Sequence, residues 1–334
     1  MARREYDESD VRIRPSRRTK PRTKDRPSHE SAITAFVITV DRGRTTCYLE
    51  DGTIVMAMKA RELGPKSVVV GDYVKLVGDT SGSEGTLARI VSVEDRKSVL
   101  VRTVDDAAQF ERNIASNIDQ LVIVAAAANP EPRRGLIDRF LVSAFTEGID
   151  PILVITKTDI ADVPDFVKEY ESIGVRCLST KIGGDLNELH SLLNGKVSVL
   201  VGHSGVGKST LLNQLTEAER ETGDVNDVTG RGRHTSSSAY AVALKDFPGQ
   251  NADANSWLID TPGVRAFGLS HLDPKAIIAA FDDLLEITNS CMTNCSHNEN
   301  DCKLNAWMAP DGVEIPERVA RVTSLRNLLA AGLE

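Results

Sequence analysis

A glycine-rich segment, GHSGVGKST at residues 202–210, has the residue types and spacing that most clearly predict chemistry in this chain. It fits the pattern Gly-x4-Gly-Lys-Ser/Thr, it follows a strand-like run and it opens a helix-like run, which is the context that the motif needs. Its glycines let backbone N–H groups point at phosphate oxygens, and the helix N-terminus adds a favourable dipole. We expect Lys208 to reach the β- and γ-phosphates of a nucleotide and the Ser209 hydroxyl to coordinate Mg²⁺. The expected contacts are Gly202, His203, Ser204, Gly205, Val206, Gly207, Lys208, Ser209 and Thr210.

A second segment, LIDTPG at residues 258–263, supplies an acid at the end of a strand-like run. The Asp260 carboxylate is expected to hold Mg²⁺ through water, and the Gly263 N–H can contact the γ-phosphate. Alone, Asp-Thr-Pro-Gly is also an ordinary turn sequence. Together with the phosphate-binding segment, it indicates a nucleotide hydrolysis site.

A third segment, VITKTDIAD at residues 154–162, has the form of an element that reads guanine. The Asp159 carboxylate can accept hydrogen bonds from guanine N1–H and the exocyclic amino group, and adenine lacks that pair of donors. Lys157 can lay its aliphatic stem over the base. The element comprises Thr156, Lys157 and Asp159, and a matching loop after the next strand comprises Ser179, Thr180 and Lys181, whose backbone N–H groups would read guanine O6.

This base-reading element precedes the phosphate-binding segment, whereas in an ordinary P-loop GTPase it follows. Either the match is accidental or the order of the domain's parts is permuted. The element stands at a strand end, one βα unit before the Ser-x-Lys loop, and this placement favours a permuted order.

The long polar segment between the phosphate-binding segment and Asp260, residues 222–240, is typical of a switch loop. Thr235 is the candidate that senses the γ-phosphate through Mg²⁺. Many GTPases orient the attacking water with a Gln after Asp-x-x-Gly, but Val264 at that position has no polar atom. His234, which can both donate and accept, is the best internal substitute. The alternatives are a surface loop without a role, and a His234 that contacts only RNA or solvent.

Three of the five cysteines crowd into CMTNCSHNENDC at residues 291–302. Three thiolates and one imidazole complete a tetrahedral structural zinc site and leave no position for a catalytic water. The alternative is a loop of reduced cysteines, but such crowding in an intracellular chain usually indicates metal. The expected ligands are Cys291, Cys295, His297 and Cys302.

The elements that must position these residues fall into four segments. Residues 1–30 contain few apolar residues and predict a basic disordered tail. Residues 31–104 contain five short strand-like runs, which favour a small barrel of the OB-fold type over a generic spacer. Residues 105–270 alternate strands and helices, as in an α/β domain with a mostly parallel sheet. Residues 271–334 are mainly helical and contain the cysteine cluster.

The amino-acid composition indicates the class of protein and its compartment. Hydrophobic residues make up 41% and charged residues 26% of the 334 residues, as in globular proteins. No apolar run approaches the roughly 20 residues of a membrane span, and the N-terminus lacks a secretory signal, so we expect a cytoplasmic protein. The net charge of −8 hides an asymmetry, because residues 11–26 carry +7 and the rest of the chain −15. This stretch is either a solvated tail or, as we favour, an arm that contacts RNA phosphates.

The order of these motifs, together with GRGRHT at 230–235 and VRAFGL at 264–269, resembles the circularly permuted ribosome small subunit-dependent GTPase A family (RsgA/YjeQ). The resemblance implies a multidomain α/β protein with an N-terminal β-barrel (OB-fold), a circularly permuted P-loop GTPase domain and a C-terminal helical zinc domain. It implies a GTP hydrolase, with Mg²⁺ and one structural zinc, that acts in late maturation of the small ribosomal subunit. The small subunit, its rRNA and GTP/GDP are the implied partners of a monomer that has no membrane contact.

Two other functions stay open at this point. The chain could be an RNA-docking assembly factor in which GTP mainly stabilises the fold. A related permuted GTPase of the large subunit is disfavoured by the barrel and by the cysteine cluster. In either GTPase the permutation has a mechanical consequence, because DTPGVRAFGLS runs directly into the C-terminal domain, where movement of the switch can be transmitted.

Overall fold

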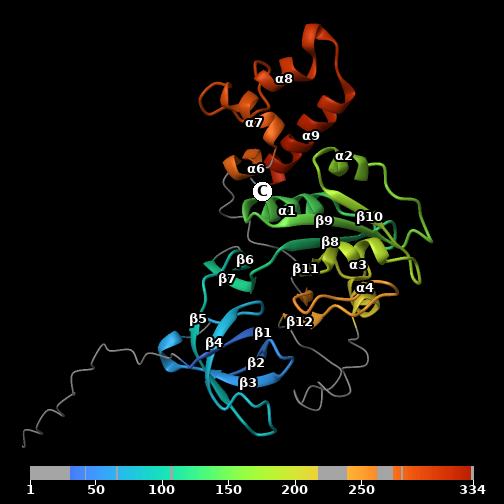
Figure 1. Ribbon diagram of the computed structural model, residues 1–334. Helices are drawn as coiled ribbons and strands as arrows, with labels where there is room; N and C mark the ends of the chain where they lie inside the picture. Colours follow the sequence, from blue (N-terminus) through green and yellow to red (C-terminus); the bar gives the residue numbers. More distant parts are fainter. Residues whose placement is uncertain are drawn as a thin grey trace, which may run out of the picture. The chain divides into compact units, whose positions relative to one another are not determined.

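Figure 1 shows the chain as a ribbon in a computed structural model. The structure describes residues 31–41, 43–64, 67–105, 108–216, 239–261, 274–279 and 281–331.

The N-terminal strands close into a five-stranded barrel. Strand order is β1-β2-β3-β5-β4, and β4 pairs back with β1, so no strand of the barrel is left at an edge. All of these pairs are antiparallel except β3 with β5, which is parallel. This arrangement confirms the expected OB-like barrel. The strands are β1 (Ile33–Asp41), β2 (Arg44–Tyr48), β3 (Ile54–Lys59), β4 (Tyr73–Gly78) and β5 (Ala88–Val93).

A second group of strands forms the predicted α/β sheet. Its order is β10-β9-β8-β11-β13-β12, with every neighbour parallel except β12, which runs antiparallel to β13. Buried parallel strands are apolar on both faces, and this explains the unbroken apolar run of β8. The strands are β8 (Gln120–Ala126), β9 (Asp150–Thr156), β10 (Arg176–Ser179), β11 (Val197–Val201), β12 (Tyr240–Ala243) and β13 (Trp257–Asp260).

Helices cover both faces of this sheet (Figure 1). Along β8 the side chains alternate, so that Leu121 and Ile123 pack in the core with α1 and α2, whereas Val122 and Val124 pack in the core with α3 and α4. The helices are α1 (Arg134–Thr146), α2 (Val167–Ser172), α3 (Asn187–Leu193) and α4 (Lys208–Leu215).

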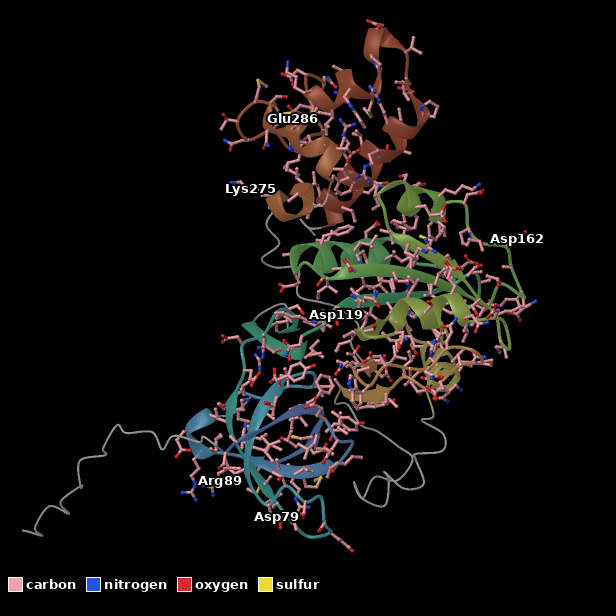
Figure 2. All side chains as sticks on the ribbon, viewed as in Figure 1. Asp79, Arg89, Asp119, Asp162, Lys275 and Glu286 are labelled. Atoms are coloured by element: carbon pink, nitrogen blue, oxygen red, sulfur yellow. The ribbon has the colours of Figure 1, made fainter. Side chains whose placement is uncertain are left out.

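A β-hairpin that the strand pattern did not predict precedes this sheet. It pairs β6 (Val99–Asp105) with β7 (Ala108–Ser116), so the expected boundary at 104/105 falls inside it. Asp119, which follows β7 and is labelled in Figure 2, accepts hydrogen bonds from Lys97 Nζ at 2.6 Å and from Val197 N at 2.8 Å. This carboxylate therefore joins the start of the hairpin to the central strand β11.

An aromatic cluster joins the barrel to the α/β sheet. The ring of Phe36 in β1 stacks on Trp257 in β13 at 5.0 Å, and Tyr48 meets the same indole edge-on at 4.9 Å. Tyr73 packs on Phe36 at 5.3 Å. These three barrel aromatics therefore pack within the protein, although aromatic side chains of this kind can also stack on nucleic-acid bases. The backbone joins the two parts as well, since Thr39 in β1 pairs with Tyr240 in β12.

The C-terminal helices pack on the α/β part through contacts of α9 with α1 and α2. The first part of this mainly helical segment is two helices, α6 and α7, because fully buried Phe281 leaves helical geometry (φ −114°, ψ 72°) before α7. The helices are α6 (Pro274–Ala279), α7 (Asp282–Asn289), α8 (Lys303–Met308) and α9 (Pro316–Ala331). None of the helices in the described ranges combines the length and the apolar character that crossing a membrane requires.

Arg321 of α9 connects three of these elements. Its guanidinium donates to both carboxylate oxygens of Asp283 in α7, at 2.9 Å from Nε to Oδ2, and lies over the ring of Phe281 at 4.7 Å. Its Nη1 also donates to the Ser172 carbonyl, at 3.0 Å, in the last turn of α2. Carbonyls at a helix C-terminus lack partners within the helix, so Arg321 caps α2 with a favourable charge.

Candidate functional site

The predicted nucleotide-binding residues meet at one edge of the α/β sheet. Because β8, β9, β10, β11 and β13 run parallel, the segments that follow their carboxyl ends lie at the same edge, where α/β sheets bind ligands. The register places these ends side by side: Ala126 pairs with Thr156, Ile155 with Ser179, Ile123 with Val201 and Leu200 with Asp260.

The phosphate-binding segment has the tight backbone that its glycines predicted. Gly202 follows β11 with φ 145°, and a Cβ there would lie 2.2 Å from the Val124 carbonyl oxygen, so no larger residue fits. Gly207, at the N-cap of α4, is left-handed with φ 97°. Both conformations favour glycine and turn the chain into the N-terminus of α4.

The base-reading element touches this segment directly. Buried Thr156 donates its hydroxyl proton to the Val206 carbonyl at 2.5 Å, and the Thr156 Oγ1 atom is 3.6 Å from a Cβ built on Gly207. Two segments that are fifty residues apart in the chain, in the reverse of the usual order, are therefore in contact.

The Ser-Thr-Lys loop is held against the same element. Thr180 N donates to the Ile155 carbonyl at 2.8 Å, and the Thr180 carbonyl accepts from Thr158 N at 3.3 Å and Thr158 Oγ1 at 3.2 Å. Ser179 and Lys181 on either side are exposed. The structure thus brings the two predicted base-reading loops together.

The side chains that would meet the base lie at the surface in this ligand-free structure. Asp159 is exposed, and Ile182, which follows the Ser-Thr-Lys loop in the chain, is 77% exposed. Lys157 adopts a left-handed backbone (φ 59°), and its ammonium donates to the Asn129 carbonyl.

The two charged groups of the phosphate side are partly buried next to each other. Lys208 Nζ donates to the carbonyls of Gly202 at 2.8 Å and His203 at 2.9 Å, within its own loop. Burial lowers the pKa of Lys208, and the Asp260 charge opposes this shift. Burial raises the pKa of Asp260, opposed by Lys208 and by hydrogen bonds from Tyr240 and the Thr261 backbone. Ser204, Gly205, Ser209 and Thr210 are exposed, as side chains that meet a ligand must be.

Three predicted site residues, His234, Thr235 and Gly263, lie outside the described residues. One residue near Asp260 was missed by the sequence reasoning. Tyr240 pairs with Asp260 across β12 and β13, and its hydroxyl lies 3.4 Å from Asp260 Oδ2. No motif marks this tyrosine, since only the strand register brings it to the acid.

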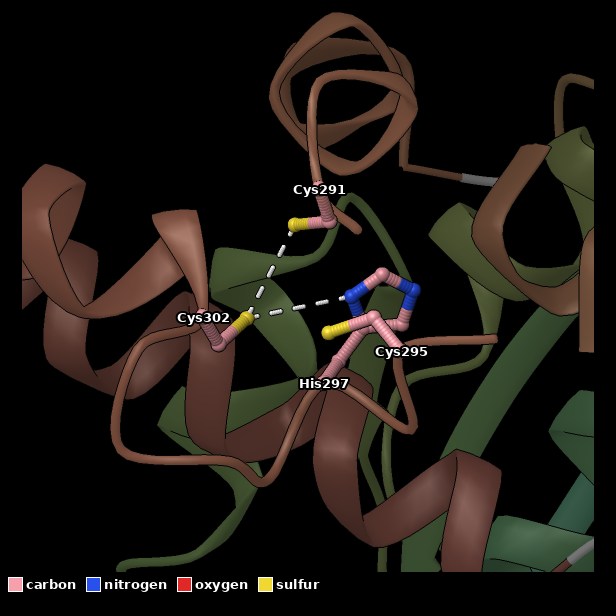
Figure 3. A group of neighbouring side chains, drawn as sticks. All are labelled: Cys291, Cys295, His297 and Cys302. Carbon is pink, nitrogen blue, oxygen red and sulfur yellow. Dashed lines mark hydrogen bonds between the residues drawn. The ribbon is translucent and has the colours of Figure 1, made fainter. Parts of the chain in front are cut away.

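The four predicted metal ligands gather at the start of α8 (Figure 3). Their ligand atoms all lie within 4.8 Å of one another, with Cys291 Sγ 3.9 Å and His297 Nδ1 3.8 Å from Cys302 Sγ. A tetrahedral zinc with Zn–S bonds of about 2.3 Å needs ligand separations of roughly 3.8 Å. The cluster can therefore hold a metal ion with little rearrangement.

The surroundings of the cluster suit metal binding. Burial lowers the pKa of His297, which favours the neutral imidazole that ligates metals. Arg326 fixes this loop by donating to the His297 carbonyl and to Asn305 Oδ1, each at 2.7 Å. Cys295 Sγ donates to Glu299 Oε2 at 3.1 Å, a bond that ligation would replace.

Comparison with known proteins gives consistent matches. The model of the RsgA GTPase family matches residues 93–270. The small ribosomal subunit biogenesis GTPase RsgA 1 of Vibrio vulnificus (strain YJ016) is 36% identical over 247 residues, covering 71% of this chain and 67% of that protein. The small ribosomal subunit biogenesis GTPase RsgA of Pseudomonas aeruginosa (strain LESB58) is 35% identical over 276 residues, covering 79% and 76%.

Two solved structures share the fold. The crystal structure of YjeQ from Thermotoga maritima superposes with a TM-score of 0.60 at 24% identity, covering 89% of this chain and 99% of that one. The crystal structure of YloQ, a circularly permuted GTPase, gives a TM-score of 0.59 at 20% identity, covering 91% and 97%.

Proposed function

The chain belongs to the RsgA GTPase family, and from that premise we propose that it binds the small ribosomal subunit and hydrolyses GTP during late maturation of that subunit. The observation that carries the proposal is the Thr156–Val206 contact, since it joins the base-reading element and the phosphate-binding segment in one site. A site with both parts selects guanine and holds a triphosphate at the same edge of the sheet.

In this proposal each loop has one task. Asp159 accepts from the base, Lys157 lies over it, Thr156 ties the element to Val206, and the loop of Ser179, Thr180 and Lys181 presents backbone N–H groups to O6. The phosphate-binding segment from Gly202 to Thr210 surrounds the phosphates. Lys208 gives up its hydrogen bonds to the Gly202 and His203 carbonyls and binds the phosphates instead.

The donors expected for Mg²⁺ fit that ion. Ser209 in the first turn of α4 and Asp260 at the end of β13 offer hard oxygen atoms, which Mg²⁺ prefers. Thr235 is the third proposed contact. When bound, Mg²⁺ supplies charge neutralisation on the β- and γ-phosphates. The protein's part is to orient the phosphates and to aim the Asp260 carboxylate.

We retain His234 as the residue that orients the attacking water and Gly263 as a backbone donor to the γ-phosphate. Both rest on sequence, and what supports His234 is the absence of a polar atom at Val264. A catalytic group on a long switch segment can be ordered by a partner, so hydrolysis by the free protein should be slow.

The metal in the C-terminal helices is proposed to be one structural zinc bound by Cys291, Cys295, His297 and Cys302. All four ligands come from protein, which leaves no open position for a water nucleophile. The ligand atoms of the four residues lie within 4.8 Å of one another, and this fit supports zinc.

The partner surface is proposed to come from the flanking segments. We keep the division into a basic tail (1–30), a barrel (31–104), the permuted GTPase domain (105–270) and the zinc domain (271–334). The tail, which lies outside the described residues, would contact rRNA phosphates because the remaining chain is acidic. We further propose a cytoplasmic monomer that works without membrane contact.

The alternative function is an RNA-docking factor in which GTP is mainly structural. Turnover separates the two, because only the enzyme should gain GTP hydrolysis when isolated small subunits are added. Large subunits serve as the control for general RNA effects. Equal turnover with either subunit and with neither would favour the docking factor.

A further inference from the structure

Tyr240 is placed between the barrel and the acid of the nucleotide site. It begins β12, where its backbone pairs with Thr39 of β1 on one side and with Asp260 of β13 on the other. Its side chain is half-buried, and its ring packs against the core formed with α3 and α4. Burial and the neighbouring Asp260 raise the pKa of Tyr240 to about 12, so the phenol keeps its proton at neutral pH.

The phenol can donate only to an acceptor that faces it, and Asp260 Oδ2 is 3.4 Å away. This separation exceeds the usual O–H···O distance of about 2.7–2.8 Å. Hydrogen bonds in active sites are often long without ligand and shorten when the ligand binds. The present distance therefore suits a contact that tightens once the site is filled.

The other neighbours of Asp260 do not fix its orientation in the same way. Lys208 is its close positive charge, but Lys208 Nζ bonds to Gly202 and His203 carbonyls and is committed to phosphates when a nucleotide arrives. The Thr261 backbone also donates to Asp260, and its position is set by the chain. Among the side chains that the structure describes around Asp260, Tyr240 supplies a hydroxyl donor that can remain on the carboxylate after a triphosphate binds, whereas Lys208 would bind the phosphates.

We propose that Tyr240 is a positioning residue for Asp260: its hydroxyl holds Oδ2 and so fixes the orientation of the carboxylate that would hold Mg²⁺ through water. This inference rests on the proposed function, in which Mg·GTP occupies the site. Since the Tyr240 backbone also pairs with Thr39, the residue connects the barrel strand β1 to the acid. A movement of β1 would therefore be transmitted to Asp260 through Tyr240.

The test is Tyr240→Phe in the full-length protein, which keeps the ring and removes the donor. The readout is the affinity for a fluorescent GTP analogue, measured over a range of Mg²⁺ concentrations and in excess EDTA. We expect unchanged affinity in EDTA and an increase of about tenfold in the Mg²⁺ concentration needed for tight binding, the size expected for losing one hydrogen bond to a charged group. Tyr48→Phe, at a ring that packs on Trp257, is the matched control and should leave the Mg²⁺ curve unchanged.

A second measurement separates positioning from packing. In an Asp260→Asn background, Tyr240→Phe should have almost no further effect on the Mg²⁺ curve, because the two residues act as one unit. Additive effects, an unchanged Mg²⁺ curve in the single variant, or an equal loss of affinity with and without Mg²⁺ would each overturn the inference. If the wild-type protein shows no Mg²⁺-dependent GTP binding, the proposed function itself fails, which is a different outcome.

Discussion

At the scale of single residues, the charged Asp260 carboxylate is unfavourable in the ligand-free fold and would be stabilised by a bound cation. It is partly buried at the end of β13, and its pKa is raised because burial outweighs the favourable effects of Lys208, Tyr240 and Thr261. A raised carboxyl pKa means that the charged form destabilises the folded chain relative to the unfolded one. The proposed Mg²⁺ would offset that cost.

Asp260→Asn should therefore stabilise the nucleotide-free protein near pH 7. The pKa of Asp260 in the folded state lies above its unfolded value of about 3.9. Ionisation of Asp260 therefore lowers the free energy of unfolding of the wild type as pH rises through the folded pKa, and Asn at this position avoids that loss. Urea unfolding in EDTA should show a gap between variant and wild type that shrinks as pH falls toward 4. A gap that does not change with pH, or a variant less stable at pH 7, would contradict this explanation.

His234→Ala should keep GTP affinity and small-subunit binding, and should lose most of the subunit-stimulated turnover. The reason is that an imidazole can both donate to and accept from the attacking water, whereas Val264 cannot. Single-turnover hydrolysis with saturating small subunits is the measurement. Stimulated turnover that survives intact would assign the water-orienting group to the ribosome instead.

At the scale of elements, the zinc-binding loop should be part of the folding of α7, α8 and α9. Cys295→Ser should remove about one zinc per chain and destabilise these helices, because a metal site formed on folding contributes its binding energy to stability. Elemental analysis and thermal unfolding check both effects. Cys177→Ser, at a half-buried thiol on β10, is the control and should retain the metal. A native protein without zinc would refute the assignment.

Arg321 should hold α2 against the C-terminal helices. Arg321→Met keeps the stem over Phe281 but loses the bonds to Asp283 and the Ser172 carbonyl, at an expected cost of roughly 1–2 kcal/mol after allowing for the exposure of Asp283. Hydrogen exchange in α2 should rise in this variant. Arg318→Met, which changes the α9 arginine over Trp307, should leave α2 unchanged. Equal hydrogen exchange in α2 in both variants would argue against this role of Arg321.

The fold and much of the site could be predicted because their signals are local. Alternating strand patterns gave the barrel, the unbroken apolar run gave β8, and the spacing of Gly202, Gly207 and Lys208 gave the phosphate segment. What escaped prediction depends on tertiary register. Nothing in the local sequence says that Phe281 divides a helix by turning its ring into the core, that Trp257 gathers Phe36 and Tyr48, or that Tyr240 stands opposite Asp260.

At the scale of the whole molecule, the permutation changes what each end of the GTPase domain is attached to. The barrel is joined to the sheet by the Trp257 aromatic cluster and by the Thr39–Tyr240 pair, close to Asp260. The C-terminal helices are joined through α9 to α1 and to α2, which follows the base-reading loop. Each flanking part therefore packs on elements next to a different half of the proposed nucleotide site, so one large partner that holds both could sense its occupancy.

The most direct test of the central claim is a change of nucleotide specificity in turnover on small ribosomal subunits. In Asp159→Asn the amide presents a donor where guanine also donates, so GTP should be poorly used, whereas xanthosine triphosphate offers a matching acceptor. The measurement is hydrolysis of both nucleotides by wild type and variant, with and without small subunits. We predict that small subunits stimulate the variant with xanthosine triphosphate and the wild type with GTP. A variant that still hydrolyses GTP on small subunits at the wild-type rate, with no gain for xanthosine triphosphate, would show that Asp159 and the phosphate-binding segment do not form one site.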